Sequence, residues 1–256
     1  MFTLSRQIES WGTVILFELS SQQVSEDKLI QAFSEAEKFI YRVDEVFSTY
    51  KENSTISRLK REEIEISSCS PEVQEVWALC KKAMELTEGA FNPWLKGFDP
   101  SGLVKGWAAQ KCGEIFEKYK VENSLVNAAG DLALRGGLLK GGEVTPWEIG
   151  IRNPEIKDEI VESFKMNTGA IATSGSYEKG AHIYDPFTNL IAIGARSATV
   201  IGPDAAIADA LATALMVSGK DGVIWFSKPE LKSYSVFVID RNSEQSWSIN
   251  INSSGS

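Results

Sequence analysis

The chain has 256 residues, 43% of them hydrophobic and 24% charged, which is the composition of a globular protein large enough to close a core without disulfides or metals. This composition excludes disordered, collagen-like and coiled-coil proteins. The formal net charge of −9, from 35 acidic and 26 basic residues, disfavours nucleic acid or an anionic membrane surface as the main partner.

The first half of the chain is mostly helical by pattern. The apolar, β-forming run 13–19 predicts one strand. Two segments after it carry apolar residues every three or four positions, the spacing of one buried helix face, and a third helix is predicted after them. These predicted helices cover 25–47, 70–89 and about 105–119.

The second half is mostly strand by pattern. Between Leu125 and Ile201, short β-forming pieces alternate with Gly, Pro and Asn, which predicts a sheet with tight turns. An apolar helix is predicted over 204–217, closed by Gly219. Further strands are predicted over 223–227, 233–240 and 246–252. No repeat or linker divides the chain, so the pattern predicts one α+β domain with helices first and the sheet later.

The predicted helix 204–217 contains one acidic residue on a nearly continuous apolar surface. A carboxylate inside a buried helix is costly unless it is paired or binds a metal, so Asp209 needs a partner. Thr213 lies one turn later on the same face, and a carboxylate with a hydroxyl is an oxygen pair that suits Mg²⁺. The simpler alternative is that Asp209 accepts a hydrogen bond from a neighbouring backbone amide while Thr213 packs beside it.

The segment DPSGLVKG, at 99–106, opens a predicted helix with a glycine turn and a lysine. Exposed amide groups, a helix N-terminus and the ammonium of Lys105 together suit a phosphate. The segment is not a Walker A loop, because it lacks that spacing and the Lys-Ser/Thr ending. The alternative is that the glycine at this helix start is needed only for its backbone conformation.

Hydroxyl groups and the chain's one histidine lie close together in the sequence. The turn Thr173-Ser174-Gly175 can offer hydroxyl and amide donors to a phosphate. His182, which precedes an Asp-Pro turn, has an unperturbed pKa near neutrality and is the candidate for acid–base work. The alternative is a surface histidine with no chemical role. Two aromatic residues, Trp11 and Tyr50, could likewise be core residues.

The cysteines and the N-terminal residues bear on where the protein works. Cys69, Cys80 and Cys112 form no CxxC pair and are odd in number, which favours a reducing compartment over a disulfide framework. No stretch reaches the length of about 18 apolar residues that spans a bilayer, and the first residues show no apolar signal region. We therefore expect a cytoplasmic protein; the alternative is a periplasmic or membrane-anchored lipoprotein from which a leader has been removed.

Seven short segments share their wording and order with one protein family. They are WGT (11–13), FSTYKENSTISRL (47–59), GAFNPW (89–94), DPSGLVKG (99–106), NAAGD (127–131), IATSG with HIYDP (171–186) and ADALATAL (208–215). In these segments the chain resembles the ApbE family of FAD:protein FMN transferases. The segments span nearly the whole chain, and their combination is highly specific.

The resemblance implies a fold and an activity. The fold is a single α+β domain over 1–252, with helices of the N-terminal half packed on a mixed or antiparallel sheet of the C-terminal half, followed by a flexible tail at 253–256. The activity is that of an enzyme that binds FAD and Mg²⁺, transfers the FMN half of FAD onto a threonine hydroxyl of an acceptor flavoprotein and releases AMP. The implied partners are FAD and an acceptor domain with a target threonine, with no nucleic acid and no transmembrane segment.

The resemblance also implies roles for individual residues. Asp209 and Thr213 are expected to bind Mg²⁺ through their side chains, with the backbone carbonyls of Gly102 and Ala206. His182 is expected to act as the general base. Contacts with FAD are expected from Trp11, Tyr50, Phe91, Asn92, Asp99, Lys105, Thr173, Ser174, Gly175, His182 and Ile183.

Within that FAD set, Trp11 and Tyr50 are expected to flank the rings, and Lys105 with the Thr173–Gly175 turn to face the pyrophosphate. Three positions depart from the family pattern: Trp11 replaces a methionine, Asn92 an acidic residue and Gln110 an aspartate. These departures affect ring stacking and hydrogen bonding to FAD, whereas the Mg²⁺ pair and the histidine are intact.

Other functions remain compatible with the same residues. A Mg²⁺-dependent FAD pyrophosphatase, which gives FMN and AMP, would use water in place of the acceptor threonine. A flavin-binding or flavin-storage protein would bind without turnover, and a purely structural α+β domain would do neither.

Overall fold

The computed structural model describes residues 1–156, 158–175, 183–241 and 245–251. Its helices are α1 (Glu26–Phe47), α2 (Thr55–Lys60), α3 (Pro71–Leu86), α4 (Ser101–Lys118) and α5 (Ala205–Ser218), with 3₁₀-helices η1 (Ile66–Ser68), η2 (Gly219–Ser227) and η3 (Pro229–Leu231). Its strands are β1 (Phe2–Ser10), β2 (Thr13–Ser21), β3 (Asn123–Ala128), β4 (Asp131–Arg135), β5 (Leu138–Lys140), β6 (Glu143–Thr145), β7 (Trp147–Arg152), β8 (Ile160–Met166), β9 (Gly169–Gly175), β10 (Ala195–Gly202), β11 (Ser235–Asp240) and β12 (Ser246–Ile249).

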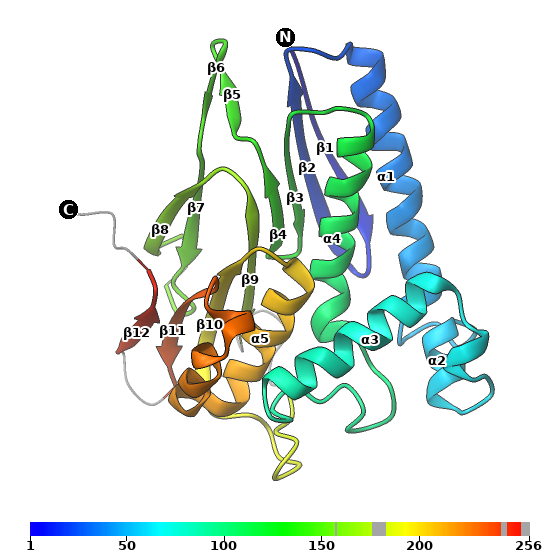
Figure 1. Cartoon of the computed structure of the whole chain (residues 1–256), viewed down its shortest axis with the longest axis vertical. Coiled ribbons are helices and arrows are strands. Elements are labelled where there is room, and N and C mark those ends of the chain that lie inside the picture. The colour runs from blue at the N-terminus through cyan, green and yellow to red at the C-terminus, as the bar shows by residue number, and fades with distance from the viewer. Residues whose placement is uncertain (157, 176–182, 242–244, 252–256) are drawn as a thin grey trace.

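An eight-stranded antiparallel sheet, in the order β1-β2-β3-β4-β9-β10-β11-β12, organises the molecule (Figure 1). The predicted α+β class is confirmed. The sheet is not confined to the C-terminal half, however, because β1 and β2 form one of its edges. Strand β1 was not predicted, since Leu4 and Ile8 are its only buried residues and they give no period-two alternation.

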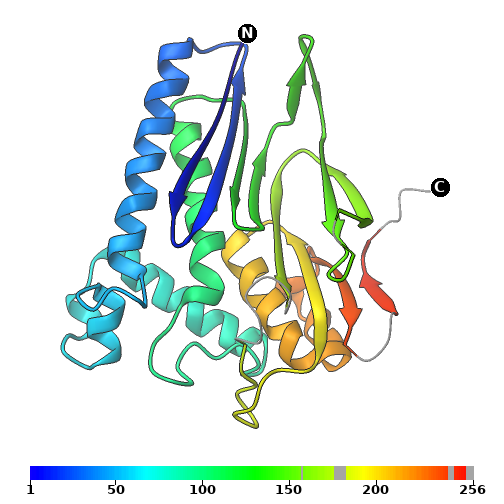
Figure 2. The ribbon, with the colours of Figure 1, turned by 180° about the vertical axis from the view of Figure 1, so that it is seen from behind.

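Helices cover one face of this sheet. α1 packs on β1 and β2, α4 on β3 and β4, and α5 on β9 and β10, an arrangement that Figure 2 shows from behind. The predicted apolar face of α1 is confirmed, since Leu29, Ala36, Ile40 and Val43 are buried in the core. The main core therefore lies between the helices and the sheet, and α5 is buried on nearly all sides, as predicted.

The hairpin β7–β8 covers part of the opposite face. A small second core forms there, in which Leu132, Leu134 and Ile171 of the sheet pack against Trp147 of β7. Residues that alternate along β4 and β9 therefore divide between the two faces. This alternation decides which side chains of these strands point to the helices.

One predicted strand is wrong. Residues 223–227 belong to the 3₁₀-helix η2, and the neighbour of β10 on that side is β11. Trp225 and Phe226 are adjacent and both buried, whereas consecutive residues of a strand point to opposite faces. A short apolar run of this kind has no period by which a strand can be told from a helical turn.

The predicted helix starts and ends are close to the observed ones, apart from α4. This helix begins at Ser101, four residues before the predicted start, because the DPSG turn itself winds into the first helical turn. The short α2 and the β5–β6 hairpin were not predicted. Among the described residues, no helix is long and apolar enough to cross a bilayer.

Candidate functional site

Segments that are far apart in the chain meet at one end of the sheet. The β1–β2 and β3–β4 turns share this end, because Ile15 of β2 pairs with Ala128 of β3. β9 runs antiparallel to β4, so its last residues, Thr173 to Gly175, extend to the same end. The N-terminal half of α4 and the middle of α5 complete the cluster.

The acidic residue of α5 is buried and makes a contact with α4. Asp209 is 2% exposed, and its Oδ2 accepts a hydrogen bond from the backbone N–H of Gly106 at 3.4 Å. The hydroxyl of Thr213 lies 3.3 Å from the hydroxyl of Ser174. Asp209 thus receives a backbone amide, as the simpler alternative required, and the neighbouring hydroxyls add oxygen atoms with which a cation site could be built.

Two glycines allow α4 to come this close to α5. A Cβ on Gly106 would lie 2.2 Å from the carbonyl oxygen of Ala205, and a Cβ on Gly102 would lie 3.1 Å from Thr213 Oγ1. The ψ angle of 18° at Gly102 also departs from the helical value, so its carbonyl is turned away from the usual helix direction. The backbone of Gly102 therefore lies directly beside the Thr213 hydroxyl. The carbonyl of Gly102 is the group that was predicted to supply an oxygen ligand.

Lys105 binds a carboxylate that the sequence analysis did not select. Its ammonium forms an ion pair with Asp131, the first residue of β4, and lies 3.8 Å from Oδ2 of Asp209. The side chain of Asp131 is 2% exposed and that of Lys105 is 23% exposed. The signal for Asp131 was its place at the end of the NAAGD segment, but its partner is 26 residues away along the chain.

The predicted Thr173–Gly175 turn is the last part of β9, and its side chains point to opposite faces. Ser174 faces the helices and meets Thr213, whereas the hydroxyl of Thr173 pairs with that of Thr199 on β10 at 2.9 Å. The structure therefore brings Ser174 to the cluster of Asp209 and Lys105. The Thr173 hydroxyl is turned away from it.

The aromatic residues predicted to flank FAD have different surroundings. Trp11 lies in the β1–β2 turn, and its indole N–H is buried without a hydrogen-bond partner among the described residues. Such a donor is costly to bury unless an acceptor atom forms a hydrogen bond with it. Phe91 is 4% exposed and approaches Gly102, so it forms part of the wall beside α4.

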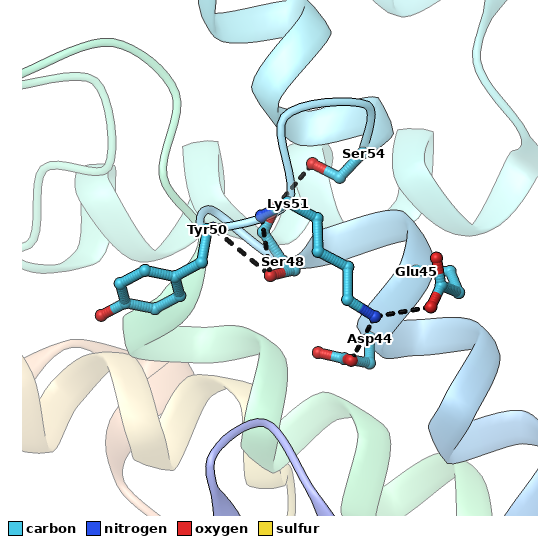
Figure 3. Close-up of polar contacts among 6 residues, drawn as sticks. All are labelled: Asp44, Glu45, Ser48, Tyr50, Lys51 and Ser54. Carbon is cyan, nitrogen blue, oxygen red and sulfur yellow. Dashed lines mark hydrogen bonds and ion pairs between the residues drawn. The ribbon is translucent and has the colours of Figure 1, made fainter.

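Tyr50, by contrast, is 98% exposed, on the loop between α1 and α2. The hydroxyl of Ser48 accepts the backbone N–H groups of Tyr50 and Lys51, each at 3.3 Å. The hydroxyl of Ser54 donates to the carbonyl of Ser48 at 2.6 Å, and the Lys51 ammonium binds Asp44 at 2.5 Å. Figure 3 shows the ring of Tyr50 pointing away from these contacts. A hydrogen-bonded loop therefore presents an aromatic side chain to solvent.

Two predicted FAD contacts also have local structural roles. The side chain of Asn92 accepts the N–H of Trp94 at 2.9 Å, and that of Asp99 accepts the N–H of Ser101 at 3.0 Å. Asp99 thereby holds the first residue of α4. Each of these hydrogen bonds uses one side-chain oxygen and shapes the loop before the helix.

The remaining residues singled out from the sequence make structural contacts within the core and between the helices. Ile183 is partly buried against the main core, and its carbonyl accepts the N–H of Ala192 at 2.9 Å. Ala206 is buried in the first turn of α5, one turn before Asp209. Gln110, where the family pattern has an aspartate, accepts the N–H of Ala205 at 2.7 Å and ties α4 to the start of α5.

His182, the predicted general base, lies outside the described residues, so its place stays a prediction. Within the described ranges, no group of three or more His, Cys, Asp and Glu side chains is arranged to hold a metal ion. A cation at this end of the sheet would therefore draw on the hydroxyl and carbonyl oxygens around Asp209.

The buried thiols do not compete for such a role. Burial raises the pKa of the Cys80 thiol, and the carboxylates of Asp99 and Asp209 raise it further. Burial alone raises the pKa of Cys112. Since the thiolate is the metal ligand and the nucleophile, both cysteines act as apolar core residues at neutral pH.

Comparison with known proteins identifies the family of this chain. The sequence model of the ApbE family matches residues 11–98 and 95–238, which together cover most of the chain and every described site segment. The chain belongs to the ApbE family. The resemblance seen in the short segments is thus confirmed, because the matched ranges include all of them.

Proteins named FAD:protein FMN transferase are relatives of this ApbE chain. That of Vibrio cholerae is 34% identical over 133 residues, which are 48% of this chain and 39% of that protein. That of Escherichia coli is 35% identical over 138 residues, 48% of this chain and 37% of that protein. That of Chlamydia muridarum is 26% identical over 277 residues and aligns with 83% of each chain.

The ApbE fold extends over nearly the whole structure. The flavin transferase ApbE of Vibrio cholerae superposes with a TM-score of 0.80 at 21% identity, covering 97% of both chains. The ApbE protein of Thermotoga maritima gives a TM-score of 0.78 at 24% identity, covering 93% of this chain and 94% of that one. The matched sequence is only about two fifths of the length of the V. cholerae and E. coli relatives.

Proposed function

We propose that this chain is a Mg²⁺-dependent FAD:protein FMN transferase, which moves the FMN half of FAD onto a threonine hydroxyl of an acceptor flavoprotein. The observation that carries the proposal is the convergence of Asp209, Thr213, Gly102 and Lys105 at one end of the sheet in an ApbE-family chain. These residues come from two helices. Their meeting is what a metal-assisted pyrophosphate site requires.

The residues fit the two groups that the family implies. A buried carboxylate on Asp209, the hydroxyl of Thr213 and the turned backbone of Gly102 form a set of hard oxygen atoms, the ligands that Mg²⁺ prefers. The indole N–H of Trp11, which has no hydrogen-bond partner in the part of the chain that the structure describes, supports a polar ligand at the same sheet end. Ala206, one turn before Asp209, is proposed to add a backbone oxygen.

The chain's own residues would then work as follows. Asp209 and Thr213 hold the cation, which neutralises charge on the pyrophosphate oxygens and orients them for phosphoryl transfer. Trp11 and Tyr50 flank the rings of FAD, and Phe91 makes a further contact with it. Remaining contacts with FAD are proposed from Asn92, Asp99, Lys105, Ser174, Gly175 and Ile183, and from Thr173 through its backbone, because its hydroxyl is turned to Thr199.

In the chemical step one bond to phosphorus forms, another breaks, and one proton is transferred. The acceptor threonine oxygen forms a bond to the FMN phosphorus, while the bond from that phosphorus to the bridging oxygen breaks and AMP leaves with the bridging oxygen. We propose that neutral His182 takes the hydroxyl proton as the attack proceeds. This role follows from the match to the HIYDP segment and from the single histidine of the chain.

One experiment tests the function against its alternatives. The protein is incubated with FAD, Mg²⁺ and a candidate acceptor domain that carries a threonine, and AMP release and acceptor mass are followed. AMP with an acceptor heavier by FMN supports the transferase, whereas AMP with free FMN supports the pyrophosphatase. Bound FAD without AMP would indicate a storage protein.

The base is tested separately. His182→Ala is expected to bind FAD and to leave the acceptor unmodified. Unchanged flavinylation by this variant would remove the assignment.

We also propose that residues 1–252 form one functional domain. Residue 252 and the expected tail at 253–256 lie outside the described residues. A cytoplasmic location remains part of the proposal. Fractionation of cells that produce the natural protein tests it, and recovery with membranes or periplasm would contradict it.

A further inference from the structure

Asp131 is a buried charged residue to which the proposed chemistry gives no task. Its side chain is 2% exposed, at the start of β4, and faces α4. Burying an ion pair costs desolvation energy, and a well-packed apolar pair is often at least as stable. Stability is therefore a weak reason for this pair, and its place beside Asp209 points to the site.

The turn before Asp131 holds the carboxylate in one place. Ala129 and Gly130 both have positive φ angles, 58° and 94°, which makes a two-residue hairpin turn that sets Ala128 opposite Asp131. The side chain of Asn127 accepts the N–H of Gly130 at 2.8 Å and closes the turn. A non-glycine residue in the left-handed region costs about 1 kcal/mol, so this turn is held by its surroundings.

The partner of Asp131 is the longer and more exposed member of the pair. Lys105 carries its ammonium on a flexible stem of four carbons, and its side chain is 23% exposed. The ammonium contacts Asp131 directly and forms only a long ion pair with Oδ2 of Asp209, at 3.8 Å and beyond hydrogen-bond distance. A shift of about 1 Å would bring the ammonium onto Asp209.

We propose that Asp131 is a positioning residue that holds the Lys105 ammonium off Asp209, so that the Asp209 oxygen can bind a divalent cation. This inference rests on the proposed function, in which Asp209 is a cation ligand. An ammonium and a divalent cation compete for one carboxylate oxygen, because both are positive and need the same short contact. Asp131 removes the competitor without touching the cation.

The test measures cation binding directly, on the whole chain and without FAD. Mn²⁺ serves as a paramagnetic probe for the Mg²⁺ site, and its Kd is read from the electron paramagnetic resonance signal of the free ion. Asp131→Asn keeps the shape of the side chain and removes its charge. Circular dichroism checks that each variant is folded.

The matched control is an ion pair between the same two elements at their other ends. Arg135 of β4 binds Glu117 of α4 at 2.5 Å, and Glu117 is 60% exposed. Glu117→Gln breaks this pair as Asp131→Asn breaks the buried one. A general loosening of α4 against β4 would affect both variants, whereas the proposed positioning affects only Asp131→Asn.

The expected result is a Kd for Mn²⁺ that rises about 10- to 100-fold in Asp131→Asn, the usual effect of losing a group that orients a metal site. Glu117→Gln should bind as the wild type does. The double variant Asp131→Asn with Lys105→Met removes the competing ammonium as well. Its Kd for Mn²⁺ should return to within about threefold of the wild type, because both charges of the ion pair are removed together.

Three outcomes would overturn the inference. Wild-type affinity in Asp131→Asn would mean that Asp131 has no influence on the cation. A double variant as weak as the single one would mean that Asp131 acts on the cation directly and not through Lys105. A wild-type protein that binds no Mn²⁺ would contradict the proposed metal site as well, whereas the first two outcomes leave that site standing.

Discussion

The two halves of α4 contact the rest of the protein in different ways. In the N-terminal half, Gly106 brings backbone against backbone, and Lys105 enters a buried ion pair. In the C-terminal half, Cys112, Ile115 and Phe116 are buried, and Phe116 packs edge to face on Phe17 with ring centroids 6.2 Å apart. Both halves bury apolar side chains, but the N-terminal half also brings polar groups to the candidate site, which separates variants that affect chemistry from variants that affect stability.

The largest effect is expected where the N-terminal half meets α5. Asp209→Ala removes the carboxylate proposed to hold Mg²⁺, and the loss of several kcal/mol of charge stabilisation lowers FAD turnover by about a thousandfold or more. AMP release at saturating Mg²⁺ measures it. Turnover within tenfold of the wild type would place the cation elsewhere.

The C-terminal half should show the opposite behaviour. Phe116→Ala leaves a cavity in the core and lowers the free energy of unfolding by about 3–5 kcal/mol, measured by urea denaturation. Its Kd for Mn²⁺ should stay at the wild-type value while the protein is folded. A weakened Mn²⁺ site in a folded Phe116→Ala protein would contradict the separation of the two halves.

Two glycines of the same helix sharpen the comparison. Gly106→Ala places a Cβ 2.2 Å from a backbone oxygen of α5, so α4 and α5 must separate, at a cost of about 1–3 kcal/mol in unfolding free energy and with weaker Mn²⁺ binding. Gly113→Ala has nothing within 4 Å of its Cβ and should be more stable by about 0.5–1 kcal/mol, because alanine favours a helix. Equal effects at the two positions would show that helix propensity, and not close approach, explains Gly106.

A smaller effect is expected at the exposed aromatic residue. Tyr50→Ala loses one proposed ring contact, worth about 0.5–1.5 kcal/mol, so the Kd for FAD rises about two- to tenfold. Thermal unfolding of the protein without FAD should be unchanged, because the side chain is 98% exposed. Quenching of flavin fluorescence measures the Kd, and Tyr50→Phe, which keeps the ring, is the control. Equal FAD affinity of the alanine variant and the wild type would remove Tyr50 from the site.

The smallest effect is expected in the turn that places Asp131. Ala129→Asn puts a residue that tolerates the left-handed region at φ 58°, ahead of Gly130, and should raise the free energy of unfolding by up to about 1 kcal/mol. Mn²⁺ binding should not weaken, since Asp131 keeps its place. Destabilisation by this change would mean that neighbouring contacts select alanine for its size.

Much of the helical part could be predicted because its signals are local. The apolar spacing of α1 and α5 follows from one helical period, and so does the position of Thr213 one turn after Asp209. β1 escaped prediction because an edge strand with few buried residues has no such period, and 223–227 were misassigned because a short apolar run has none either. The ApbE segments added what periodicity lacks, namely which local pieces belong to one site.

The sequence by itself determined the family, the α+β class and the residue types of an oxygen-rich site with one basic residue near it, since these depend on neighbours a few positions apart. Only the tertiary structure decided that Ser174 and not Thr173 faces α5, because the direction of each side chain depends on how the helices and β7–β8 cover the sheet. It also decided that Lys105 meets Asp131 beside Asp209. Contacts between residues far apart in the chain depend on sheet register and helix packing, which no local pattern carries.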